Sequence, residues 1–102
     1  MISDAKRHHF LLGIGGIGMS AIARHLRQVG HVVAGYDLTR SPLTEALERE
    51  GMAVVHDDDL NALPDWVMTL PPSEMSVVWT PAVPRQMGLL QALEGRGHVL
   101  VK

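Results

Sequence analysis

Residues 9–20 read HFLLGIGGIGMS, and this stretch decides the fold. A short apolar run is followed by glycines at four of six positions, namely 13, 15, 16 and 18. This is the G-x-G-x-x-G spacing, in which the first glycine makes a tight turn, the second lets the backbone approach a phosphate, and the third lets a helix pack closely on a strand. We therefore expect a buried strand, a glycine loop, and a helix whose first N–H groups face an anion.

Outward from this loop, short apolar runs alternate with amphipathic segments. Strands are expected at 9–12, 31–36, 53–56, 75–80 and 98–101. Helices are expected at 19–29, from a Ser41 cap with Pro42 first to Gly51, in a short turn capped by the acids 57–59, and at 86–94. For residues 64–74 the sequence does not decide between a strand and a helix. The expected inner faces are Met19, Ile22, Ala23, Leu26 and Val29; Leu43, Ala46 and Leu47; and Leu89, Leu90 and Leu93.

Alternation of this kind predicts an α/β fold. Strands that are apolar throughout indicate a parallel sheet covered on both faces. Right-handed crossovers then give a three-layer Rossmann-like fold with a five-stranded parallel sheet in the order 3-2-1-4-5.

Composition excludes several classes of function. The chain has 102 residues, which is one domain, and a formal net charge of −2, which argues against binding nucleic acid or a membrane surface through bulk charge. It has no cysteine, so disulfides and thiolate metal sites are excluded. With no long apolar span and no signal peptide in the sequence, we expect a cytoplasmic protein. Its six histidines are expected at strand edges and on the surface rather than on a metal, because none has a zinc-like spacing.

Asp37 is the second candidate ligand contact. It follows the expected second strand, 19 residues after Gly18, where an acid in a dinucleotide-binding fold accepts hydrogen bonds from ribose. The alternative is a turn residue or a helix cap. A ligand would lie at the carboxyl ends of the strands, between the glycine loop, residues 36–40 and residues 80–84. The glycine pattern alone does not separate NAD, FAD and UDP-sugars.

Three stretches together resemble the first domain of the Mur ligases. They are HFLLGIGGIGMS at 9–20, VAGYD at 33–37 and VVWTPAVP at 77–84, and they span most of the chain. The Thr80-Pro81-Ala82 form is closest to Bacteroidetes-type members that add L-alanine to UDP-N-acetylmuramate. The segment RQMGL at 85–89 departs from the family's usual helix start, so contacts beyond Pro84 are not carried over.

The resemblance implies a single N-terminal domain, residues 1–102, that binds the UDP portion of UDP-N-acetylmuramate. The resemblance implies that a central domain binds ATP and Mg and that a C-terminal domain binds the amino acid. We expect both domains to be absent from this chain, in which there is no P-loop motif. No cofactor, metal ligand or catalytic residue is implied here. The implied substrate contacts are Gly15, Gly16, Ile17, Gly18, Met19 and Ser20 along the diphosphate, Asp37, Thr39 and Arg40 at the uridine end, and Thr80, Pro81 and Ala82 beside the cleft.

Three alternatives stay open at this point. One is the related ligase that recycles a peptide onto UDP-N-acetylmuramate. Another is an NAD(P)-binding Rossmann module, and the third is a free-standing regulatory domain.

Overall fold

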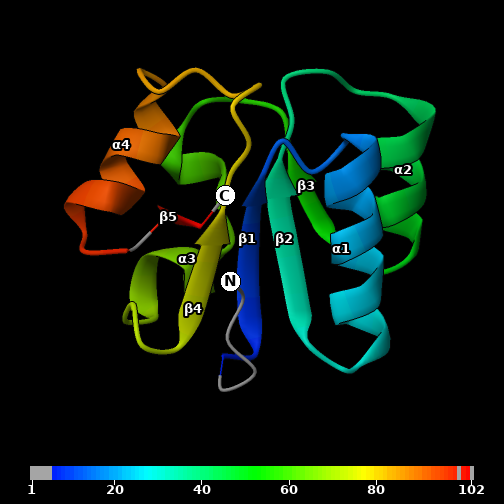
Figure 1. Cartoon of the computed structure of the whole chain (residues 1–102), viewed down its shortest axis with the longest axis horizontal. Helices are drawn as coiled ribbons and strands as arrows, with labels where there is room; N and C mark the ends of the chain where they lie inside the picture. The colour runs from blue at the N-terminus through cyan, green and yellow to red at the C-terminus, as the bar shows by residue number, and fades with distance from the viewer. Residues whose placement is uncertain (1–5, 99, 102) are drawn as a thin grey trace.

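A five-stranded parallel sheet forms the centre of the computed structural model, which describes residues 6–98, 100 and 101 (Figure 1). The strand order is β3-β2-β1-β4-β5, and every pairing is parallel. The predicted fold class, strand number and order are confirmed. The strands are β1 His8–Leu12, β2 Val32–Tyr36, β3 Ala53–Val55, β4 Met75–Val78 and β5 Leu100–Val101.

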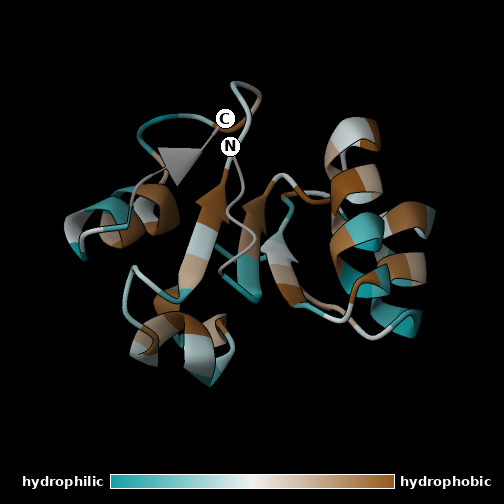
Figure 2. Cartoon of the chain, turned by 60° about the horizontal axis from the view of Figure 1, so that its bottom comes forward, coloured by the Kyte–Doolittle hydropathy of each residue, from teal (hydrophilic) through white to brown (hydrophobic). Residues whose placement is uncertain are grey.

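Helices cover both faces of the sheet and make three layers (Figure 2). They are α1 Ile17–Gln28, α2 Pro42–Arg49, the 3-10 helix η1 Leu60–Ala62, α3 Asp65–Thr69 and α4 Gly88–Gly95. Side chains alternate along β1, so that Phe10 and Leu12 pack with the α3 and α4 layer while Leu11 packs with the α1 and α2 layer. Each face of the sheet is thus covered by a hydrophobic core, which is what apolar parallel strands require.

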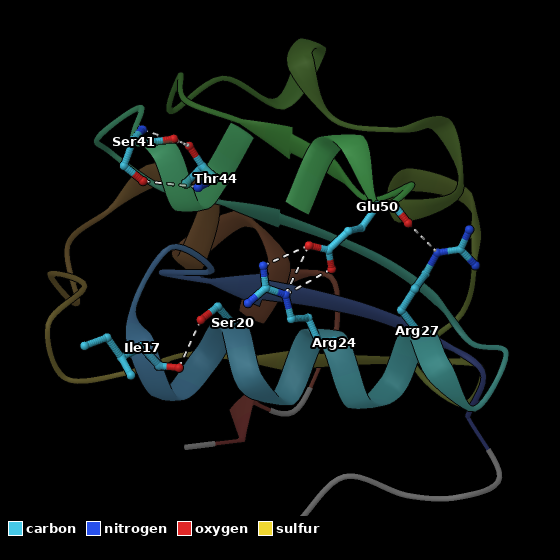
Figure 3. Close-up of polar contacts among 7 residues, drawn as sticks. All are labelled: Ile17, Ser20, Arg24, Arg27, Ser41, Thr44 and Glu50. Atoms are coloured by element: carbon cyan, nitrogen blue, oxygen red, sulfur yellow. Dashed lines mark hydrogen bonds and ion pairs between the residues drawn. The ribbon is translucent and has the colours of Figure 1, made fainter. Parts of the chain in front are cut away.

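The start of α2 agrees with its sequence prediction. The Ser41 hydroxyl accepts from the Thr44 N–H at 3.1 Å, and the Thr44 hydroxyl accepts from the Ser41 N–H at 2.9 Å (Figure 3). Pro42 is the first helical residue, and Gly51 ends the helix with φ of +100°. Glu50 then ties this end to α1, because its carboxylate accepts from Arg24 at 2.8 Å (Figure 3).

The predicted inner face of α1 is wrong at two positions. Met19, Ala23 and Leu26 are buried as expected, but Ile22 is 38% exposed and Val29 is 52% exposed. Ile22 lies at the rim of the arc that the other three define, and Val29 follows the last helical residue. Ser20 takes a place in the buried face instead.

The third glycine of the motif does not serve the packing role predicted for it. A Cβ at Gly18 would have nothing within 4 Å, so no close helix–strand approach depends on it. A close approach is required instead at Gly35 in β2, between this strand and its neighbours in β1 and the glycine loop, since a Cβ there would lie 2.5 Å from the Leu11 carbonyl oxygen and 2.7 Å from Ile14 Cβ. The tight turn at Gly13 is confirmed by its φ of +89°.

The region for which the sequence did not decide between strand and helix, 64–74, contains the short helix α3, which ends at Thr69 shortly before Pro71 and Pro72. Val67 is fully buried there. The predicted cap before η1 is confirmed for Asp59, which accepts from the Asn61 N–H at 3.0 Å. Among the residues described, no helix is long and apolar enough to cross a bilayer.

The surface placement predicted for the histidines is wrong for two of the six. His9 is fully buried and His98 is 4% exposed. His9 is tolerated because both ring nitrogens have partners, Nδ1 at 2.5 Å from the Ser76 hydroxyl and Nε2 at 2.8 Å from His31 Nδ1. Part of the predicted last strand, residue 99, lies outside the described residues.

Candidate functional site

A cavity of about 390 Å³ opens at the carboxyl ends of the strands. It lies where the strand order reverses, since β1 leads to β2 and β3 on one side while β4 and β5 lie on the other (Figure 1). Open α/β sheets bind their ligands at such a switch point. The lining residues are Gly13, Tyr36, Asp37, Leu38, Asp58, Val83, Pro84 and Met87.

The glycine loop is tied to β2 by its backbone. The N–H groups of Gly13 and Ile14 both donate to the Tyr36 carbonyl, at 2.7 and 3.0 Å, and Gly16 N–H closes the turn onto the Gly13 carbonyl at 3.0 Å. The next residue begins α1, and no side chain caps that helix. Its first N–H groups have no partner in the helix itself, and Gly16, Ile17 and Gly18 are all exposed. This uncapped start is suited to an anion.

Asp37 holds the loop from the other side. Its Oδ2 accepts from the Gly15 N–H at 2.8 Å, and its Oδ1 accepts from the Thr39 N–H at 3.0 Å. A Cβ at Gly15 would lie 2.7 Å from this carboxylate and 2.8 Å from Thr44 Cγ2. The second glycine is therefore required by contacts inside the protein, whether or not a ligand also approaches it.

The opposite wall of the cavity follows β4. The Thr80 hydroxyl accepts from the Ala82 N–H at 3.1 Å, and the Thr80 carbonyl accepts from the Val83 N–H at 3.0 Å. This turn brings Val83 under the glycine loop, where its Cγ2 would lie 3.3 Å from a Cβ at Gly13. Since Gly13 also has a positive φ, a side chain there would be strained as well as crowded.

Two carboxylates border the cavity. Asp37 and Asp58 both line it, together with Tyr36. Burial, followed by the charges of Asp58, Asp37 and Asp57, raises the pKa of Tyr36 above its ordinary value. Tyr36 thus stays a neutral hydroxyl in the cavity at physiological pH.

The structure brings together only part of the predicted site. Of the residues proposed as contacts, Asp37 lines the cavity directly. The Met19 side chain is buried in the core, which leaves this residue only its backbone for a ligand. Ser20 donates its hydroxyl to the Ile17 carbonyl at 3.0 Å and its N–H to the Gly16 carbonyl at 2.8 Å. Arg40 lies 3.7 Å from Glu48 on the surface. Four further predicted residues, Ile17, Thr39, Pro81 and Ala82, are exposed.

Two lining residues, Asp58 and Met87, were missed by the sequence reasoning. Leu38, which is 78% exposed, falls within the lining segment 36–40 that the sequence predicted. Met87 lies in the segment that departs from the family pattern, and Asp58 was treated only as a local cap. Nothing local in the sequence distinguishes Asp58 from the acids on either side of it.

A sheet of this order, with an uncapped glycine-rich helix start beside a cavity at the switch point, defines a Rossmann-like ligand-binding domain. The family model described as "Mur ligase family, catalytic domain" matches residues 8–100. The chain belongs to the Mur ligase family, as its three motifs predicted.

Known proteins similar to the chain carry related names. A UDP-N-acetylmuramate–L-alanine ligase of Porphyromonas gingivalis is 46% identical over 97 residues, covering 95% of the chain and 21% of that protein. The structure of a UDP-N-acetylmuramate-alanine ligase from Thermotoga maritima is also similar, with a TM-score of 0.78 and 26% identity. The match covers 92% of the chain and 20% of the Thermotoga protein. The structure of a murein peptide ligase from Psychrobacter arcticus has a TM-score of 0.74 and 25% identity, and the match covers 93% of the chain and 18% of the Psychrobacter protein. The chain thus spans about a fifth of the length of these relatives.

Proposed function

We propose that the chain is the domain of a UDP-N-acetylmuramate–L-alanine ligase that binds the UDP portion of UDP-N-acetylmuramate. The observation that carries this is the adjacency of the uncapped α1 start and the cavity on one edge of the sheet. One feature suits a diphosphate and the other suits the nucleoside attached to it. The 46% identical relative carries the name of this activity, which favours it over the peptide-recycling ligase.

The charge distribution supports this orientation of the ligand. In this proposal the diphosphate lies along residues Gly15 to Met19, where the helix dipole favours negative charge. The backbone N–H groups at 17–19 are the ones available to it, because those of Gly15 and Gly16 already donate to Asp37 and to the Gly13 carbonyl. The uridine end enters the cavity, because Asp37 and Asp58 there accept hydrogen bonds from neutral donors and repel an anion. Ser20 follows this run in α1. Thr39 and Arg40 border the uridine end, and residues 80–82 border the cleft.

The chemistry of the whole protein belongs to other domains in this proposal. The reaction is an ATP-dependent amide ligation of L-alanine in cytoplasmic peptidoglycan biosynthesis, a step of cell-wall formation on which cell shape and division depend. In this proposal ATP and magnesium bind to the central domain, as the resemblance to the family implies. Its contribution is to capture and orient the substrate for the central and C-terminal domains.

Nucleotide competition followed by NMR tests the proposal on the 102-residue chain. UDP and UDP-N-acetylmuramate are expected to shift the amide resonances of Gly15 to Met19 and of Leu38, whereas NADH is expected to leave them in place. Shifts with NADH and none with either uridine compound would refute the proposal and favour a dinucleotide module. Shifts confined to residues far from the cavity would place the ligand elsewhere.

A further inference from the structure

Asp58 makes a contact that spans the molecule. Its Oδ2 accepts from the Gly88 N–H at 3.0 Å, and its Oδ1 accepts from the Leu89 N–H at 2.8 Å. These are the first two residues of α4, so a carboxylate from a segment 30 residues earlier caps this helix. A charged acceptor at a helix start satisfies N–H groups that the helix cannot and is favoured by the helix dipole.

The helix α4 has no cap of its own. Met87 occupies the N-cap position, and it makes no capping bond through its side chain. Val83, Pro84 and Met87, which directly precede the helix, form the β4 wall of the cavity. The position of that wall therefore depends on what fixes the start of α4.

The Asp58 segment reaches across the switch point. It follows β3, whereas α4 follows β4, and β2 and β1 lie between these two strands in the sheet (Figure 1). Leu63 and Val67, further along the same segment, are buried in one core with Leu89 and Leu90. The segment is thus held at its far end, and Asp58 is the point where it meets the cavity.

We infer that Asp58 is a positioning residue for the substrate cavity, which it serves by fixing the start of α4 and the wall of residues 83–87 behind the bound nucleoside. This inference rests on the proposed function. The two acids beside Asp58 do not share the role, since Asp59 caps η1 and Asp57 is an exposed carboxylate of the same loop.

The test compares four variants of the 102-residue chain with the parent. Asp58→Ala removes the cap, whereas Asp58→Asn keeps the shape of the side chain and one of its two acceptor oxygens. Asp57→Ala removes a neighbouring charge without touching α4. Gln91→Gly, at an exposed position inside α4, lowers helix stability by propensity alone and leaves the cap in place.

Two measurements are made on each variant: affinity for UDP by titration, and hydrogen exchange of individual amides. Asp58→Ala is expected to weaken UDP binding roughly tenfold, the scale of losing a charged helix cap, with Asp58→Asn intermediate and the other two near the parent. Asp58→Ala is also expected to speed exchange at Val83, Met87, Gly88 and Leu89, whereas Gln91→Gly speeds exchange only within α4.

Two outcomes would overturn the inference. One is unchanged exchange at Val83 and Met87 in Asp58→Ala, and the other is an equal loss of UDP affinity in Gln91→Gly, which would reduce the effect to helix stability. A parent chain that does not bind UDP would contradict the proposed function instead, and the exchange pattern would still decide whether Asp58 holds the wall.

Discussion

The starts of α1 and α4 face the same edge of the sheet and are completed in opposite ways. At α4, Asp58 supplies a carboxylate that bonds two backbone N–H groups. At α1, no side chain caps the helix, and the loop before it is almost free of side chains. Both helix starts present backbone N–H groups that have no partner within their own helix, and both are the positive end of a helix dipole.

The difference shows which of the two helix starts can bind the anion of a ligand. A protein carboxylate fills one start permanently, so that start becomes part of the wall. The other start is left open, and glycines keep Cβ atoms away from it, so it remains available to a ligand phosphate. Four predictions test this contrast between the two helix starts.

The largest effect is expected from Gly35→Ala, which would displace the α1 start without touching α4. The added Cβ would lie 2.5 Å from the Leu11 carbonyl oxygen and 2.7 Å from Ile14 Cβ, so β2 and the glycine loop must separate. The free energy of unfolding should fall by about 3 kcal/mol, as expected for overpacking against backbone. Urea denaturation measures it. Gly18→Ala, which has nothing within 4 Å of its Cβ, is the matched control and should not destabilise the protein.

Gly16→Asp would make α1 resemble α4 by giving it a capping carboxylate. Gly16 is the N-cap, with φ of −70° and ψ of 153°, which any residue adopts, and its Cβ would approach only the Gly13 carbonyl, at 3.4 Å. The free energy of unfolding should rise by about 0.3 kcal/mol, because aspartate is a slightly better helix N-cap than glycine. Affinity for UDP should fall by about 100-fold, which is roughly 2.7 kcal/mol, because the ligand phosphate meets a fixed negative charge.

Gly16→Ala is the control for this experiment, since it adds the Cβ without the charge and should retain most of the affinity in the same calorimetric titration. Undiminished affinity in Gly16→Asp would show that the anion does not lie at the α1 start. Gly16 gives a cleaner test than Gly15, where a Cβ would collide with the Asp37 carboxylate and disturb folding as well.

Asp37→Ala tests the carboxylate that borders the open start. It removes the acceptor for Gly15 N–H and for Thr39 N–H, together with a proposed acceptor for the uridine end. Affinity for UDP should fall by about 2 kcal/mol, the scale of a hydrogen bond to a charged group. Asp37→Asn keeps an acceptor and should lose less. Equal affinity of all three proteins would move the nucleoside out of the cavity.

The sequence predicted those features that depend on neighbours in the chain. The strand order follows from alternation and crossover handedness, and the Ser41 cap from a serine followed directly by a proline. The same local reasoning misplaced Ile22 and Val29, because periodicity gives the direction of a buried arc but not its width. It also assigned close packing to Gly18 when the contact belongs to Gly35.

The features that the sequence did not predict depend on distant residues. From the sequence, Asp58 is one of three acids expected to cap the short turn that follows them, and only the folded chain brings it to α4. The β4 wall could be anticipated from Thr80 to Pro84, but Met87 could not, since its place depends on where α4 begins. His9 looked like a strand-edge residue, and its burial depends on Ser76 and His31, which come from two other segments.

The smallest effect concerns the opposite edge of the sheet and uses His9. Burial, followed by the nearby charges of His31, His8 and Lys6, lowers the pKa of His9 from 6.5 to about 4. Between those values the unfolded chain binds a proton that the folded protein excludes, so stability is complete above pH 6.5 and is lost as the pH falls toward 4. From pH 7 to pH 5.5 the free energy of unfolding should fall by about 1 kcal/mol.

Denaturant unfolding at these two pH values measures this loss, and His9→Gln should remove most of it. His25→Gln, which changes an exposed histidine on α1, should keep it. Because His9 lies at the amino ends of the strands, its protonation weakens the sheet on the side away from both helix starts. UDP affinity measured on the folded protein should therefore change much less than stability over the same interval. If affinity fell in parallel with stability, the open start of α1 would depend on the whole sheet rather than on the loop that forms it.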